Sequence, residues 1–175
     1  MITRNRIMPS TLLGVLLLLL SGCASNPANP DDPEGTLMGT RPATVVFEDF
    51  LNTLDDTVTT SGITFPDWDR NDTAGYNAQA CAQGTNARAY QTQLEGDPSS
   101  NPAASADAMR RGFVGQGYTI GNVFDYSTTS PGQGVIINAE TPTGMTVQFS
   151  TTKNGSSIKV ISDCTADPAA KETTT

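Results

Sequence analysis

The last third of the chain contains the pattern that most restricts its fold. Apolar and polar side chains alternate over residues 145–150, and a similar alternation follows over Ile158–Cys164. A period of two places successive side chains on opposite faces of a strand, so each segment can bury one face and expose the other. The Asn154-Gly155 pair between them is typical of a hairpin turn. The sequence therefore predicts an antiparallel hairpin here.

Two further strands are predicted before this hairpin. Tyr118–Phe124 and Val135–Thr141 are separated by a loop over Ser127–Gly134, and Pro142-Thr143-Gly144 forms a tight connection to the next strand. Consecutive strands with short connections favour an antiparallel meander that is polar on one side and packed against helices on the other. Ile63–Trp68 and Ala87–Leu94 are weaker candidates for extended segments earlier in the chain.

Two segments have the spacing of amphipathic helices. The first follows Thr40, the expected N-cap, with Pro42 in its first turn, and ends at Gly62. The second begins at Asn101-Pro102 and ends near Gly117. Their expected inner faces are Ala43, Phe47, Phe50, Leu51, Leu54 and Val58 in the first helix, and Ala103, Ala106, Met109 and Phe113 in the second.

The predicted fold class is α+β, in the order α–β–β–α–β–β–β–β. A meander of four or more strands packs against the two helices. In the second helix an ion pair is expected between Asp107 and Arg111, four residues apart. Gly112 and Gly115 each weaken that helix by about 1 kcal/mol relative to alanine, so it requires tertiary packing to persist.

Composition excludes several classes of function. The 175 residues carry a net charge of −8, which argues against nucleic-acid binding through a basic surface. The chain contains no His, so Ser-His-Asp and Cys-His nucleophile systems are excluded within it. There is no glycine-rich phosphate or dinucleotide motif and no nucleophile elbow. No cofactor is expected.

The N-terminus has the form of an export signal. Arg4 and Arg6 precede an apolar run from Leu12 to Leu20, and this run of nine residues is too short to span a bilayer, which takes about 20. The run ends in Leu20-Ser21-Gly22-Cys23, which resembles the lipobox of bacterial lipoproteins. The alternative is an ordinary signal peptide with a Cys at this position by chance.

The resemblance implies that residues 1–22 are removed and that Cys23 becomes the lipid-modified first residue. Its diacylglyceryl group, with two or three acyl chains in all, would hold the protein stably on a membrane. The composition resembles that of a high-GC actinobacterial protein, for which the outer face of the cell membrane is expected. In a Gram-negative cell, Ala24 after the Cys would instead imply the outer membrane. The mature chain, without Arg4 and Arg6, has a net charge of −10.

The rest of the chain divides into three parts. Residues 23–40 contain Pro27, Pro30 and Pro33 and no apolar period, which predicts a disordered tether after the lipidated Cys23. A single folded domain is expected over residues 41–165, followed by a disordered tail over 166–175.

With Cys23 modified by lipid, Cys81 and Cys164 are the remaining cysteines. An exported protein meets an oxidising compartment, and two cysteines permit one pairing, so a Cys81–Cys164 disulfide is predicted. The alternative is a reactive or metal-binding thiol pair, which lacks a His or a further Cys to complete a site.

Three groups of residues are candidates for chemistry, and each also has a simpler role. Asp67–Asp72 has the early spacing of a calcium loop, but Asp72 replaces the glycine of the turn and Ala78 replaces the final Glu, which favours a solvated polar loop. One face of the first helix carries three carboxylates, those of Glu48, Asp55 and Asp56. They could act in hydrolysis, but we expect them to form a surface that faces water. The aromatic side chains are interpreted either as a ligand surface or as core; they are Trp68, Tyr76 and Tyr90.

The mature domain also diffusely resembles uncharacterised actinobacterial lipoproteins of the mycobacterial LppA type. The resemblance rests on the anchor Cys, the two later Cys, Gly117-Tyr118 after a helix and a C-terminal β meander that includes Val160–Cys164. It implies a small domain without catalysis and names no partner. Our first hypothesis is therefore a binding or cell-envelope accessory role, in which an envelope protein is the expected partner. The first alternative is a surface-displayed inhibitor or exclusion protein that uses a loop such as 125–134. The second is an envelope hydrolase that uses acidic residues.

Overall fold

The computed structural model describes residues 39–73, 76–81, 86–126 and 134–171, and these residues form an α+β domain. The order of helices and strands is the predicted one, followed by a short 3₁₀ helix, η1. The elements are α1 Ala43–Ser61, β1 Asn77–Ala80, β2 Arg88–Gly96, α2 Pro102–Gly115, β3 Thr119–Asp125, β4 Val135–Glu140, β5 Thr146–Thr151, β6 Ser156–Ile161 and η1 Pro168–Lys171.

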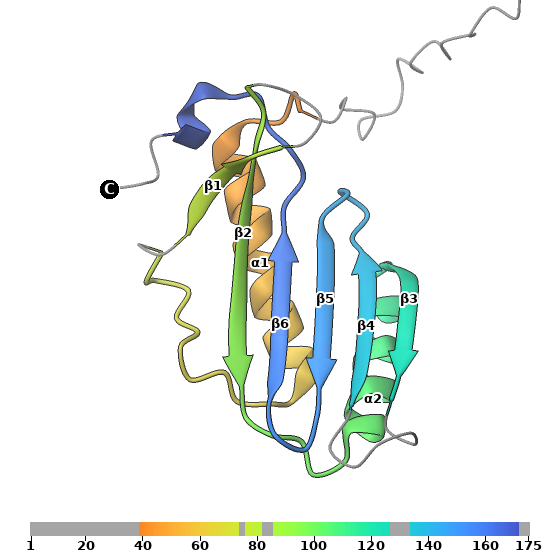
Figure 1. The fold of residues 1–175 in the computed structure, drawn as a ribbon. Coiled ribbons are helices and arrows are strands. Elements are labelled where there is room, and N and C mark those ends of the chain that lie inside the picture. The colour runs from red at the N-terminus through yellow and green to blue at the C-terminus, as the bar shows by residue number, and fades with distance from the viewer. Residues whose placement is uncertain (1–38, 74–75, 82–85, 127–133, 172–175) are drawn as a thin grey trace, which may run out of the picture. The chain divides into compact units, whose positions relative to one another are not determined.

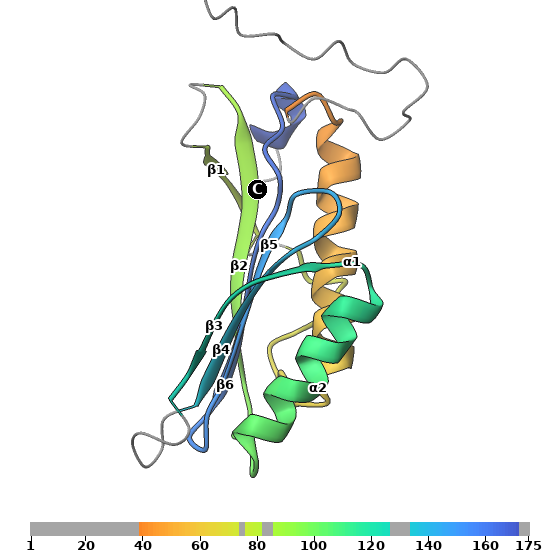
Figure 2. The ribbon, with the colours of Figure 1, turned by 90° about the vertical axis from the view of Figure 1, so that its right-hand side faces the viewer.

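The described strands form one antiparallel sheet of six, in the order β1-β2-β6-β5-β4-β3. The predicted meander is confirmed, because β3, β4, β5 and β6 are successive neighbours, and β2 and β1 extend the sheet beyond β6. Both helices lie on one side of the sheet (Figure 2), and Figure 1 looks onto the face without helices.

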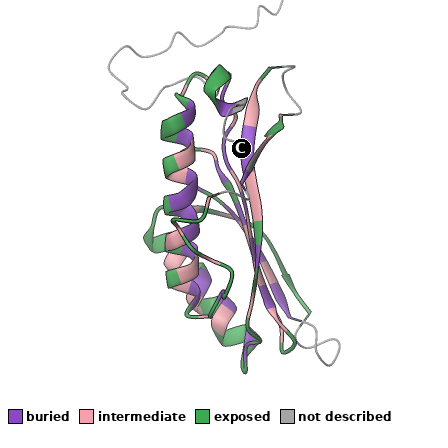
Figure 3. Ribbon diagram, turned by 90° about the vertical axis from the view of Figure 1, so that its left-hand side faces the viewer, coloured by how far each residue is buried: buried purple, intermediate pink, exposed green. Residues whose placement is uncertain are grey.

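The alternation in the sequence sets the orientation of each strand. Val147 and Phe149 of β5 are fully buried beneath the helices, whereas Thr146 is exposed and Gln148 is half-buried on the other face. Ile158 and Val160 of β6 are buried in the same way. The core therefore lies between the sheet and the two helices, with the inward sides of the helices buried (Figure 3).

Helix α1 starts at a different residue from the one expected. Pro42, and not Thr40, occupies the N-cap position, and its own side chain makes no capping hydrogen bond. Gly62 ends the helix in the left-handed conformation, as predicted, with φ of +62°. Val46 is fully buried although it was not assigned to the inner face, and Phe47 is only half-buried.

Helix α2 follows the prediction closely. Asn101 caps its N-terminus by accepting a hydrogen bond from the Ala104 amide, and Pro102 is its first residue. Gly117 follows its C-terminus with φ of +80°. The exception on the expected inner face is Ala103, which is exposed.

The position of the first strand was predicted wrongly. Ile63–Trp68 forms no strand: it is a loop whose Thr64 carbonyl accepts a hydrogen bond from the Asp97 amide, while Phe65 is buried in the core. The first strand is instead β1, which pairs with β2. The second extended candidate, Ala87–Leu94, is confirmed as β2 with a shift of one or two residues at its ends.

The predicted domain boundary at residue 165 is too early, because residues 166–171 belong to the fold. The Asp167 carboxylate accepts a hydrogen bond from the Ala43 amide at the start of α1, at 2.9 Å, and Ala170 is 1% exposed. The amide satisfied by Asp167 is one of the unpaired donors of a helix N-terminus, so this segment caps α1 in place of Thr40.

The two glycines of α2 have different environments. A Cβ at Gly112 would lie 2.1 Å from the Thr60 Cγ2 of α1, whereas nothing lies within 4 Å of a Cβ at Gly115. We therefore expect Gly115→Ala to raise the unfolding free energy by up to about 1 kcal/mol through helix propensity. Gly112→Ala should lower it by roughly 1 kcal/mol, since overpacking costs more than the propensity gain.

Urea denaturation of the two variants measures this difference. Thr60→Ser removes the obstructing methyl group, so it should rescue Gly112→Ala when the two changes are combined. Equal unfolding free energies for Gly112→Ala and Gly115→Ala would show that the contact between α1 and α2 accommodates the added methyl group with no loss of stability.

Candidate functional site

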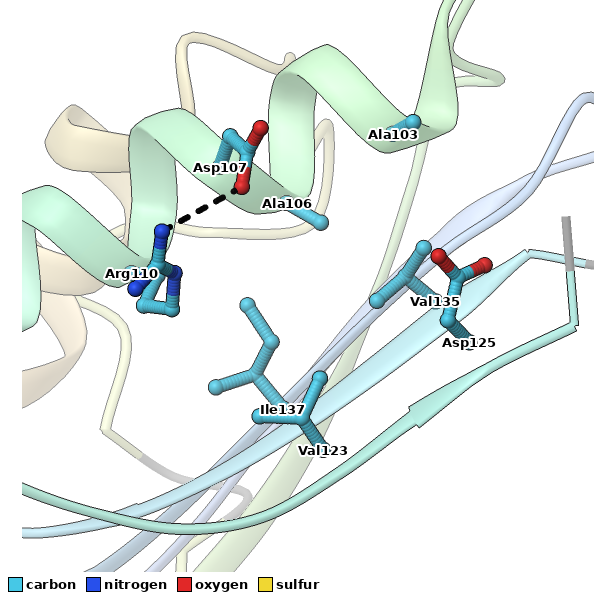
Figure 4. Close-up of a pocket in the computed structure, with 8 residues that line it drawn as sticks. All are labelled: Ala103, Ala106, Asp107, Arg110, Val123, Asp125, Val135 and Ile137. Atoms are coloured by element: carbon cyan, nitrogen blue, oxygen red, sulfur yellow. Dashed lines mark ion pairs between the residues drawn. The ribbon is translucent and has the colours of Figure 1, made fainter.

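A groove lies between α2 and the edge of the sheet formed by β3. Its floor is apolar, with Val123 from β3 and Val135 and Ile137 from β4 directed towards the helix (Figure 4). Ala103 and Ala106 of α2 form the opposite wall, and their small side chains leave a cavity of about 110 Å³.

The rim of the groove carries charge. Arg110 and Asp107 of α2 form an ion pair at 3.6 Å (Figure 4), and Asp125 of β3 lines the groove from the sheet side. The ion pair expected between Asp107 and Arg111 is therefore replaced by one between residues three apart, which are also neighbours on a helix surface.

Strand β3 is the part of this site that distinguishes it from the rest of the sheet. Among the described strands it pairs with β4 alone. Val123 and Phe124 are 45% and 44% exposed, which is unusual for large apolar side chains in a sheet. The register shifts between Ile120 and Val123, which marks a β-bulge. An edge strand with exposed apolar side chains beside a groove can pair with an added strand and accept one of its side chains.

The loop over 125–134 that the sequence suggests as a contact surface adjoins this edge. Residues 127–133 lie outside the described residues. At the two ends of that loop the Tyr126 amide donates a hydrogen bond to the Gly134 carbonyl at 2.9 Å, which continues the pairing of β3 with β4.

The acidic face of α1 holds a loop in place. Arg70 donates hydrogen bonds to Glu48 and, at 2.5 Å, to Asp55. Asp55 also accepts a hydrogen bond from the Trp68 Nε1 at 2.8 Å. Two of the three candidate carboxylates, Glu48 and Asp55, are thus paired with Arg70, and the third, Asp56, is exposed. The expectation of a simple water-facing surface is incomplete, since this face binds the segment that follows α1.

The segment Asp67–Asp72 forms turns. The Asp69 carboxylate accepts a hydrogen bond from the Asn71 amide at 2.8 Å, which is a local Asx turn. Across the described ranges there is no group of three or more His, Cys, Asp or Glu side chains that could hold a metal ion.

The candidate aromatic residues pack in or against the core rather than forming a ligand surface. Tyr90 and Tyr76 are 1% and 6% exposed, and both contact Phe50, with ring centroids 6.1 and 5.6 Å away. Burial raises the pKa of the Tyr76 phenol, and nearby carboxylates, of which Asp72 contributes most, raise it further. Trp68 packs on the margin of this cluster.

The disulfide between Cys81 and Cys164 is present, with Cα atoms 6.3 Å apart. It joins the end of β1 to the segment that follows β6. Cys23, the proposed site of lipid attachment, lies outside the described residues.

Sequence reasoning missed an ion-pair cluster beside this disulfide. Arg41 contacts Asp49 of α1 and Asp163, whose carboxylate is 3.2 Å from the guanidinium. Burial raises the pKa of Asp163, and the charge of Arg41 opposes that rise. Because Arg41 and Asp163 are 122 residues apart, no local pattern in the sequence could have paired them.

Comparison of the chain with protein-family models, curated proteins and solved structures gave no match. No helix among the described residues has the length and apolar character needed to cross a membrane.

Proposed function

We propose that the chain is a lipid-anchored extracytoplasmic protein whose domain binds an envelope protein through the β3 edge. The anchor rests on Leu20-Ser21-Gly22-Cys23 after an apolar run that begins at Leu12. The Cys81–Cys164 disulfide supports export independently, because disulfides persist in oxidising compartments. The expected location is the outer face of the cell membrane, or the outer membrane in a Gram-negative organism.

The observation that carries the binding proposal is the exposed edge strand β3 beside the groove of α2. A partner segment in an extended conformation would add a strand to β3 through backbone hydrogen bonds. Its alternate side chains would point towards the groove, where the floor of Val123 and Ile137 favours an apolar residue. The proposal contains no catalytic step.

A surface-displayed inhibitor or exclusion protein is the alternative proposal. It is favoured by the position of the edge, because Tyr126 and Gly134 place the two ends of the suggested contact loop directly beside β3. In that case the partner segment would come from an enzyme or an invading agent rather than from a resident envelope protein.

The anchor is tested by mass and by location. The membrane-extracted protein should begin at Cys23 and carry the added mass of two or three acyl chains. Cys23→Ala should abolish acylation and release the domain from stable membrane association. An unmodified Cys23 in the membrane-extracted protein would contradict the anchor.

The β3 edge is tested with a matched pair of exposed valines. Val123 in β3 and Val45 in α1 are 45% and 44% exposed. Chemical crosslinking of the full chain in intact cells should give one discrete adduct, and Val123→Lys should reduce that adduct at least tenfold, since a lysine blocks edge pairing.

Val45→Lys is the control, and it should leave the adduct unchanged. Identification of the crosslinked peptide separates a resident envelope protein from the target of an inhibitor. An adduct equally sensitive to both substitutions, or insensitive to both, would rule out the β3 edge as the binding site.

A further inference from the structure

The face of the sheet without helices has an ordered polar row across four strands. Register places Asn138 of β4 beside Gln148 of β5, then Lys159 of β6, then Gln93 of β2. Neighbouring strands lie about 4.8 Å apart, so these side chains are close enough to contact one ligand together.

Hydrogen bonds fix the orientation of the first two side chains. Gln148 Nε2 donates to Asn138 Oδ1 at 2.9 Å, and Asn138 Nδ2 donates to the Asn122 carbonyl at 3.0 Å. These bonds use one N–H of each amide, and among the described residues they leave the Gln148 carbonyl oxygen and further N–H groups to a ligand. Pre-oriented amides of this kind bind hydroxyl and amide groups at little cost in entropy.

Two exposed aromatic rings lie to one side of Asn138, near the start of β4. Phe124 is opposite Ile136 of β4, on the face away from the helices, and Tyr126 follows two residues later. The two rings are 44% and 43% exposed, their centroids are 6.4 Å apart and their planes differ by 5°. These two exposed and nearly parallel rings offer apolar contacts to the C–H groups of a ligand.

A hollow of about 230 Å³ lies on the other side of Asn138, towards the end of β4. It forms where the bulge of β3 brings Gly121 against β4, so that a Cβ there would lie 3.4 Å from the Asn138 carbonyl oxygen. Thr119, Glu140 and Thr146 line it with hydroxyl and carboxylate groups. From Ile136 to Glu140 the track along β4 extends roughly 14 Å.

The charge of this face differs from that of the chain. The polar row and the two rows that flank it contain three charged side chains, Glu95, Lys159 and Glu140, and Glu95 accepts a hydrogen bond from Gln93. The face is therefore close to neutral in a chain of net charge −8, which favours an uncharged ligand.

We propose that the open face along β3 and β4 binds an uncharged linear polysaccharide. A sugar ring has C–H groups on its faces and hydroxyls at its edge. One or two sugar rings pack against Phe124 and Tyr126. The hydroxyl or acetamido groups of the next sugar rings contact Asn138, Gln148 and the hollow beside Gly121. This site is separate from the groove of the proposed function, because Val123 and Phe124 point to opposite faces of β3.

The test uses the full detergent-solubilised chain and three probes. The probes are chitohexaose, which is neutral and N-acetylated, cellohexaose, which is neutral without acetamido groups, and oligogalacturonate, which is acidic. Titration calorimetry should detect binding of at least one neutral probe with a dissociation constant below about 1 mM, and weaker binding of the acidic one. The two neutral probes distinguish an acetamido-containing glycan from a plain one.

The double variant Phe124→Ala and Tyr126→Ala should weaken binding at least tenfold, and Gln148→Ala should weaken it severalfold. Val45→Ala is the matched control for loss of exposed apolar surface, and its affinity should not change. Val123→Lys should keep polysaccharide binding even where it abolishes the crosslinked adduct, so the two proposals fail separately. Absence of binding to both neutral probes, preference for the acidic probe, or unchanged affinity in the double variant overturns the inference.

Discussion

Replacing both Cys81 and Cys164 with serine is expected to lower the unfolding free energy by roughly 2–5 kcal/mol. The disulfide closes a long loop, with a sequence separation of 83 residues, and so restricts the unfolded chain. It also ties the edge hairpin of β1 and β2 to the segment after β6. Chemical denaturation of the oxidised protein and of the variant gives the difference directly.

Reduction provides the control for this prediction. The wild-type protein in a strong reductant should shift to the denaturation midpoint of the double serine variant, and the variant should not respond to the reductant. Coincident midpoints for the oxidised protein and the variant would mean that the crosslink contributes nothing to the stability of the folded domain.

Phe50→Ala is expected to cost about 3–5 kcal/mol, the range for truncating a buried phenylalanine. Phe50 is 0% exposed and lies between three other rings, those of Phe47, Tyr76 and Tyr90. The substitution therefore leaves a cavity where α1 packs on the sheet. Urea denaturation, or the thermal midpoint where the variant is too unstable for extrapolation, measures the loss.

The same substitution at Phe124 is the matched control, because that ring is 44% exposed and lies outside the core. Its cost should remain within about 0.5 kcal/mol. A small loss of unfolding free energy at Phe50 together with a large loss at Phe124 would contradict the placement of Phe50 in the core and of Phe124 on the surface.

The sequence predicts those parts of the fold that depend on residues close together in the chain. The last three strands follow from alternation and from turns such as Asn154-Gly155, and α2 follows from Asn101-Pro102 and Gly117. The first strand was misplaced because β1, Asn77–Ala80, has no apolar alternation and depends on pairing with β2. Ile63–Trp68 contains apolar residues that pack in or against the core, and their spacing is also typical of a strand, which led to the wrong prediction.

The candidate site could not be predicted, because it results from the order of the strands. The exposure of β3 depends on β2 pairing with β6, so that β3 is left at the edge, and that pairing joins residues 60 to 70 positions apart. The roles of Arg70 and Arg41 depend likewise on partners up to 22 and 122 residues away. The number of cysteines did indicate the disulfide, since the predicted export and lipidation leave Cys81 and Cys164 as the remaining pair.

The connection between the two ends of the domain determines how it bears mechanical force. Gly39 forms a parallel bridge with Thr165, and the Ala166 amide donates to the Gly39 carbonyl at 2.8 Å. Thr165 is adjacent to Cys164, which is covalently joined to Cys81. Tension along the proposed tether would therefore enter the domain through the bridge at Thr165 as well as through α1. The load would be shared with a crosslinked part of the sheet, so the proposed anchor would pull on a domain that resists unfolding from its N-terminal end.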